Sequence, residues 1–165
     1  MSVQTIVDTL SNMNKLHVSL LEVSKKKTET LKTGDIAGFQ DLLAQERKHV
    51  KAINQMEANR LSLIEDWSRN QGLDPSSTTV SVMLEVLEGS DKQNVEQATV
   101  QLAETLVELK NQEQLNKELI EQSLQFIQLS MDMISPTIKN INYSNKSIKQ
   151  DQPASASRSL FDSKA

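Results

Sequence analysis

The chain has 165 residues, a formal net charge of −4 and no cysteine. Without a thiol it cannot form a disulfide, a thiolate zinc site or a cysteine nucleophile, and its acidic balance argues against nucleic-acid binding, which needs a clustered basic face. Aromatic residues make up 3% of the chain, and it holds only 4 glycines and 3 prolines. This composition favours a few long helices packed through Leu, Ile and Val.

No run of about 18 apolar residues occurs, so we expect no transmembrane helix and no stable membrane insertion. Residues 1–5 lack the basic and apolar regions that begin a secretory signal peptide. From these two observations we expect a soluble cytoplasmic protein.

A first helix is predicted over residues 3–32, because apolar residues recur there at steps of three and four. The seam consists of Val3, Ile6, Leu10, Met13, His17, Leu20 and Leu31, with a polar interval at Ser24 and Lys27. Gly34 can take the left-handed conformation that ends a helix, and Asp35 can cap the next helix. Since this connection is short, the flanking helices should be antiparallel neighbours.

A second helix is predicted over residues 35–70 by the same spacing. Its seam consists of Phe39, Leu43, Glu46, Val50, Ile53, Glu57, Arg60, Ile64 and Trp67, and Leu42 and Leu61 widen it. The break that follows contains Gly72 and Pro75, which stop a helix. A short third helix is predicted over residues 78–87, since the alternative, a lone strand, would have no partner.

The fourth helix is predicted from Asp91 to Ser135, where Pro136 ends it. Its middle, residues 110–117, is mostly polar, which indicates a solvated or bending region. The predicted fold is therefore all-α: an elongated antiparallel helical hairpin or coiled coil of three to four helices, with a long last helix.

We divide the chain into a helical domain, residues 1–135, and a C-terminal tail, residues 136–165. The tail is rich in Ser, Asn, Gln and Lys, so it cannot bury enough area to offset its ordering entropy, and we expect it to be flexible. Spaced apolar residues give it the pattern of a segment that folds on binding: Ile138, Ile141, Tyr143, Ile148, Leu160 and Phe161.

Catalytic and metal-binding patterns are missing from the sequence. The two histidines are His17 and His49. His17 could face Glu46 across the hairpin as a structural contact, because no His/Asp/Glu spacing completes a metal shell. His49, between Lys48 and Lys51, is most simply a solvated residue. No P-loop, dinucleotide fingerprint or nucleophile elbow occurs, so we expect neither an enzyme nor a cofactor.

The second half of the fourth helix carries more apolar residues than one stripe. They are Leu119, Ile120, Leu124, Phe126, Ile127, Leu129, Met131, Met133 and Ile134. A helix that is apolar over a broad arc must bury that arc against something, and the rest of the chain offers little to cover it. A partner helix would suit this surface, and methionines suit an adaptable groove. Dimerisation or internal packing explains the surface equally well.

A sequence pattern runs through the first two predicted helices and the turn between them. It reads His17-x-x-Leu20-Leu21, then Lys27-Thr28-x-x-Leu31-Lys32-x-Gly34-Asp35-Ile36, then Leu42-Leu43, Glu46, Val50, Ile53, Glu57 and Arg60. The pattern resembles the FlgN family of flagellar export chaperones, most specifically around Gly34-Asp35. The chain's end is also similar, with Tyr143 and the final Phe161-Asp162-x-Lys164-Ala165, whereas residues 72–90 match least.

The resemblance implies a cytoplasmic chaperone that binds the hook–filament junction proteins FlgK and FlgL, prevents their premature assembly and delivers them to the type III export gate. It also implies that the end of the last helix and the following segment hold the client, and that a tyrosine there, Tyr143, docks on the export-gate protein FlhA. The candidate partner-binding residues are Leu119, Ile120, Leu124, Phe126, Ile127, Met131, Ile134, Ile138 and Tyr143.

Two alternatives stay open at this point. A structural coiled-coil protein would homo-oligomerise through its last helix and would not bind FlgK or FlgL. An enzyme would need a metal or cofactor to co-purify. The sequence leaves the oligomeric state and the preferred client undecided.

Overall fold

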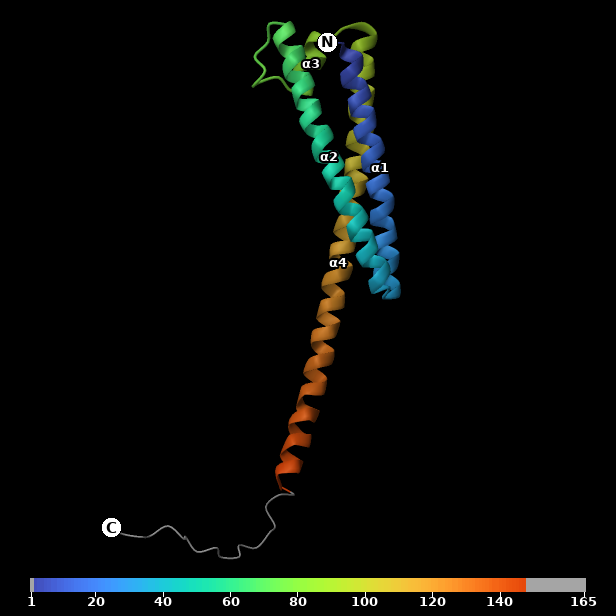
Figure 1. Ribbon diagram of the computed structural model, residues 1–165, viewed down its shortest axis with the longest axis vertical. Coiled ribbons are helices and arrows are strands. Elements are labelled where there is room, and N and C mark those ends of the chain that lie inside the picture. Colours follow the sequence, from blue (N-terminus) through green and yellow to red (C-terminus); the bar gives the residue numbers. More distant parts are fainter. Residues whose placement is uncertain (1, 148–165) are drawn as a thin grey trace, which may run out of the picture. The chain divides into compact units, whose positions relative to one another are not determined.

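The structure is a computed structural model that describes residues 2–147, with side chains described for residues 2–134. The described part contains four helices and no strand: α1 (Val3–Thr33), α2 (Ile36–Asn70), α3 (Val80–Val86) and α4 (Gly89–Ser147) (Figure 1). This confirms the all-α class and the long last helix. The chain divides into two compact units, Met1–Glu121 and Gln122–Ala165. None of the described helices is apolar over a stretch long enough to cross a bilayer.

In the first unit, the turn between α1 and α2 is built by local capping, as expected. Gly34 has φ +71°, in the left-handed region that favours glycine, and it ends α1. The Asp35 side chain accepts a hydrogen bond of 2.9 Å from the backbone N–H of Gly38, which satisfies a free donor in the first turn of α2. The two helices therefore run antiparallel as a hairpin, and the first part of α4 lies beside them (Figure 1).

The apolar core of this unit lies where the start of α1, the end of α2, α3 and the start of α4 meet. Its most buried side chains are Ile6, Trp67, Met83 and Val95, each at most 2% exposed. Burial of one such side chain contributes about 1.5–3 kcal/mol. This contribution outweighs the lower helix propensity of the β-branched residues in α3. The prediction of a third helix is confirmed.

The predicted seams are correct for α1 and only partly correct for α2. Ile6, Leu10 and Met13 are buried, whereas Val50 and Leu61 of α2 are 43% and 49% exposed. The exposed positions precede the last seam residues, Ile64 and Trp67, which are 3% and 2% exposed in the core that α2 shares with the start of α1.

The predicted end of the fourth helix is wrong. Instead of stopping at Ser135, α4 continues through Pro136 to Ser147. Proline removes one backbone donor and crowds the carbonyl four residues earlier, at a cost of about 3 kcal/mol, but it leaves later residues free to form their own helical bonds. Residues 136–147 are therefore helical. The rest of the expected tail, residues 148–165, lies outside the described residues, and the functional division at residue 135 stays a prediction.

Candidate partner-binding site

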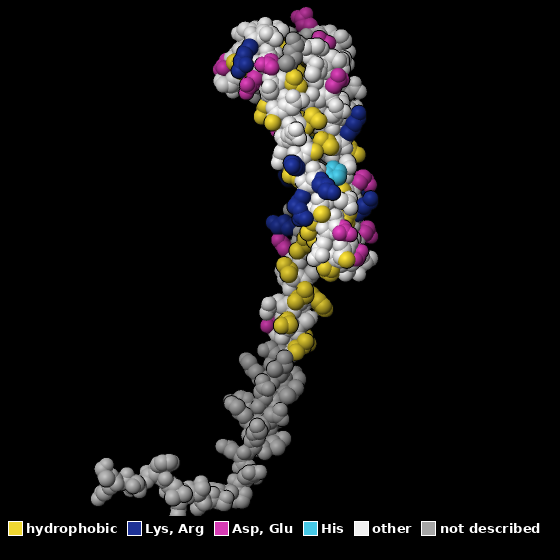
Figure 2. Space-filling model, in the orientation of Figure 1, with side chains coloured by type: hydrophobic (Ala, Val, Ile, Leu, Met, Phe, Trp, Pro, Cys, Tyr) yellow, Lys and Arg dark blue, Asp and Glu magenta, His cyan; other side chains and the backbone are white. Residues whose placement is uncertain are grey.

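The apolar residues of α4 within the second unit form an exposed surface, which we call the α4 apolar patch. It consists of Leu124, Phe126, Ile127, Leu129, Met131, Met133 and Ile134, whose exposed fractions range from 53% (Ile134) to 78% (Met133). Figure 2 shows hydrophobic side chains gathered on the last part of α4 that is drawn in colour. Single exposed apolar residues are ordinary on protein surfaces, but seven of them within residues 124–134 indicate an interaction site.

Five of the residues predicted for partner binding lie in this patch: Leu124, Phe126, Ile127, Met131 and Ile134. The prediction left out two members, Leu129 and Met133, which are as exposed as the others. The signal that identifies them is helical spacing, because they follow Phe126 by three and seven residues and so share its side of the helix.

Two further predicted residues, Leu119 and Ile120, belong to the first unit. Leu119 is half-buried, and Ile120 lines a hollow of about 290 Å³ together with Phe39 and Leu43 of α2. Lys117 lies on the wall of the same hollow. Because apolar and charged side chains line this hollow together, it suits the side chain of an amphipathic partner segment.

The last two predicted residues, Ile138 and Tyr143, lie on the helical backbone of α4. Their side chains lie outside the described ones. Tyr143 was expected in a flexible tail after the last helix, and it is instead part of that helix. The apolar residues Ile148, Leu160 and Phe161 lie outside the described residues.

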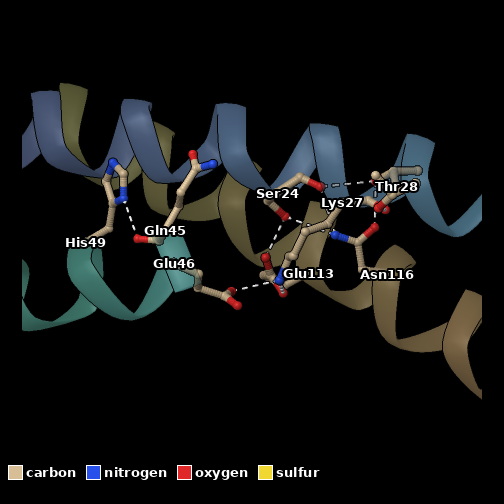
Figure 3. A network of polar contacts seen from close by, with 9 residues as sticks. Ser24, Lys27, Thr28, Gln45, Glu46, His49, Glu113 and Asn116 are labelled. Atoms are coloured by element: carbon tan, nitrogen blue, oxygen red, sulfur yellow. Dashed lines mark hydrogen bonds and ion pairs between the residues drawn. The ribbon is translucent and has the colours of Figure 1, made fainter. Parts of the chain in front are cut away.

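The structure also contains a buried polar cluster that the sequence analysis did not anticipate, which we call the Lys27 layer (Figure 3). It consists of Ser24, Lys27 and Thr28 of α1, Glu46 of α2, and Glu113 and Asn116 of α4. The Lys27 ammonium lies 2.7 Å from a carboxylate oxygen of Glu46 and 3.0 Å from one of Glu113, and its side chain is 6% exposed. One buried cation therefore joins all three long helices of the first unit.

Hydrogen bonds complete this layer around the cation. The Asn116 amide donates to the backbone carbonyl of Ser24 over 2.9 Å, the Thr28 hydroxyl donates to the Asn116 amide oxygen, and the Ser24 hydroxyl donates to Glu113. Each buried polar group of the Lys27 layer thus has a partner, which is the condition for burying it without a large penalty. Asn116 is 2% exposed, whereas Lys110, Asn111, Gln114, Leu115 and Lys117 are exposed, so the expectation that residues 110–117 are solvated holds for most of the segment and fails for Asn116.

The histidines act in local hydrogen bonds. His17 Nδ1 donates a hydrogen bond to the Met13 carbonyl over 2.8 Å. The expected contact between His17 and Glu46 is wrong, because the Glu46 carboxylate pairs with the Lys27 ammonium instead. His49 accepts from the Ser19 hydroxyl over 2.7 Å, which links α2 to α1. Among the described residues, no three His, Asp or Glu side chains are placed to hold a metal ion.

Another ion pair, between Glu57 and Arg60 of α2, lines the same hollow as His17. Arg60 donates two hydrogen bonds of 2.7 Å to the Glu57 carboxylate. The hydrogen bond from Arg60 is the main cause that holds the pKa of Glu57 below its ordinary value of 4.5. Burial opposes that shift, and nearby His17 adds to it. The pair explains why two charged residues can occupy the α2 seam.

Comparison with known proteins gives two matches. The family model described as FlgN protein matches residues 1–149. A protein of Bacillus subtilis (strain 168) named "Uncharacterized protein YvyG" is 38% identical over 168 residues, and the alignment covers 100% of each chain. No solved structure matches the chain significantly.

Proposed function

Because the chain belongs to the FlgN family, a family of non-enzymatic flagellar export chaperones, we propose that its clients are the hook–filament junction proteins FlgK and FlgL. It binds them in the cytoplasm, prevents their premature assembly and delivers them to the export gate. The proposed client-binding residues are Leu119, Ile120, Leu124, Phe126, Ile127, Met131, Ile134 and Ile138.

The α4 apolar patch is the observation that supports this proposal. Seven exposed apolar side chains lie within residues 124–134, where Asp132 is the one charged residue. Such a surface is costly to leave in water, and amphipathic helices of a client can cover it by helix-in-groove recognition. The same contact would cover the client's own apolar seam and so prevent the client from assembling before export.

Delivery requires a second contact, and we assign it to Tyr143. In our proposal this tyrosine docks on the export-gate protein FlhA while the patch holds the client. The two contacts use different residues of α4, so a Tyr143→Ala variant should keep its affinity for FlgK and FlgL and lose its affinity for FlhA. A pull-down with each partner separates the two steps.

Calorimetric titration with purified FlgK and FlgL tests the client contact. In the Phe126→Ser/Ile127→Ser double variant we expect at least a hundredfold weaker binding, because each large apolar side chain contributes about 1.5–3 kcal/mol when fully buried. The matched control is Val107→Ser, which removes an apolar side chain that is 59% exposed on α4 within the first unit. Binding of both clients by the double variant with unchanged affinity would contradict the proposal.

The same patch also supports the second candidate function, a structural protein that homo-oligomerises through α4. Light scattering over a dilution series distinguishes the two. A tight oligomer that neither FlgK nor FlgL dissociates or binds would favour the structural role.

A further inference from the structure

The α4 apolar patch is divided into two stripes. Leu124, Ile127, Met131 and Ile134 follow one another at steps of three, four and three residues and form the Leu124 stripe. Phe126, Leu129 and Met133 follow at steps of three and four and form the Phe126 stripe. At 100° per residue, the centres of the two stripes are roughly 150° apart around the helix axis. The two stripes therefore face nearly opposite directions.

Polar residues separate the stripes on both sides of the helix. On the wider side, the Gln128 amide donates to Asp132 over 3.0 Å. On the narrower side, the Ser130 hydroxyl donates to the backbone carbonyl of Phe126 over 2.9 Å. These polar groups already have hydrogen-bond partners on the same helix, so a partner that covers the neighbouring stripes leaves none of them without a hydrogen bond.

One partner helix cannot cover both stripes. Packed helices lie about 8–10 Å apart, and side chains interlock only on the sides that face each other. A helix covered from one side buries an arc of roughly 100–140°, as in a coiled-coil seam. A second helix, on the other side of α4, is needed to reach the remaining stripe.

The apolar area is also large enough for contacts on both stripes. At 25 cal/mol per Å² and 2–3 kcal/mol per large side chain, each residue of the patch offers about 100 Å². A standard stable interface buries roughly 800 Å² per partner, of which roughly 450 Å² is apolar. Both stripes together offer about 700 Å² of apolar area, so a client that covered only the Leu124 stripe would leave about 300 Å² in water.

From these observations we propose that residues 124–134 of α4 lie between two helical segments of one client, one segment on each stripe. Both client segments have apolar seams with few charges, because a charged group facing these stripes would lose water without gaining a partner. This inference deepens the proposed client binding and rests on it.

Single-cysteine crosslinking on the full chain tests the inference. The natural chain has no cysteine, so Ile127→Cys places one attachment point on the Leu124 stripe and Leu129→Cys places one on the Phe126 stripe. Gln125→Cys, on the wider polar side, is the matched control. Each variant carries a benzophenone maleimide, is irradiated with FlgK, and is analysed by mass spectrometry.

We expect the probes at residues 127 and 129 to crosslink to two different helical segments of the same FlgK molecule, and the probe at residue 125 to crosslink weakly. Crosslinks from both stripes to one segment, or mainly to a second copy of this chain, would overturn the inference and leave client binding standing. Failure of the unsubstituted chain to bind FlgK and FlgL would overturn the proposed function and the inference with it.

Affinity gives a second, independent measurement. Ile127→Ser and Leu129→Ser should each weaken FlgK binding about tenfold or more, because each removes an anchor from a separate contact. If Leu129→Ser binds within twofold of the natural chain, the Phe126 stripe is not covered by the client and the inference is wrong.

Discussion

Replacing the buried cation of the Lys27 layer should destabilise the first unit more than any other single charge change in it. Lys27→Met keeps most of the length of the side chain and removes the ammonium, which leaves the carboxylates of Glu46 and Glu113 without a counter-charge. Removing one partner of a buried pair costs about 3–5 kcal/mol. The two glutamate side chains are 23% and 38% exposed, so water compensates part of this, and we expect a loss of about 2–3 kcal/mol.

Urea denaturation followed by circular dichroism at 222 nm measures this loss. With a slope of about 2 kcal/mol per molar urea, the midpoint should fall by about 1 M. The matched control is Lys25→Met, because Lys25 is 51% exposed on the same helix and, among the described side chains, forms an ion pair with Glu22 alone. The control should change the free energy of unfolding by less than about 0.5 kcal/mol.

A triple variant separates lost pairing from lost packing. Replacing Lys27 by Met together with Glu46→Leu and Glu113→Leu removes the stranded carboxylates, so it should recover at least half of the lost stability. An unchanged midpoint for Lys27→Met, or a triple variant less stable than the single one, would refute the view that Lys27 acts by neutralising two partly buried carboxylates.

Three further outcomes are expected. Gly34→Ala should lower the free energy of unfolding by about 1–2 kcal/mol, because residues with a side chain rarely adopt a φ of +71°. An added Cβ would meet no neighbouring atom, so this backbone strain is the whole cost. Met83→Ala should cost about 2–5 kcal/mol in the same urea assay, because Met83 is fully buried in the core. Glu57→Gln should destabilise by less than about 1 kcal/mol at pH 7, since the pair with Arg60 is reached by water. The pKa of Glu57 is lowered, so its contribution is present above its ordinary value of 4.5, and the variant and natural chains should converge as the pH falls below that value.

Helix identity and the first turn were predictable because their causes are local. A glycine in the left-handed conformation and an aspartate three residues before the N–H that it caps act within one turn of the chain. Periodicity located α1 and α2 for the same reason, since neighbouring turns of one helix present their side chains to the same side. The broad apolar character of α4 was also visible in its residue types.

The partners of charged residues could not be predicted in the same way. Glu46 satisfied the spacing for a contact with His17, but it bonds Lys27, which is 19 positions away, and Lys27 also bonds Glu113, which is 86 positions away. Ser24 and Lys27 interrupt the predicted α1 seam, and residues 110–117 were expected to be solvated or bent. Ser24, Lys27, Glu113 and Asn116 nevertheless meet in one polar layer, because α1 and α4 bring them to the same level of the bundle (Figure 3).

The sequence by itself therefore determined the elements of this protein, because helices and caps depend on hydrogen bonds between residues a few positions apart. It also supplied the family pattern, which rests on residue types and spacing. Tertiary structure alone decided that Lys27 is enclosed between two carboxylates and that the side chains of residues 124–134 stay exposed. Burial is a property of what lies next to a side chain in space, and the neighbours that enclose Lys27 are separated from it along the chain.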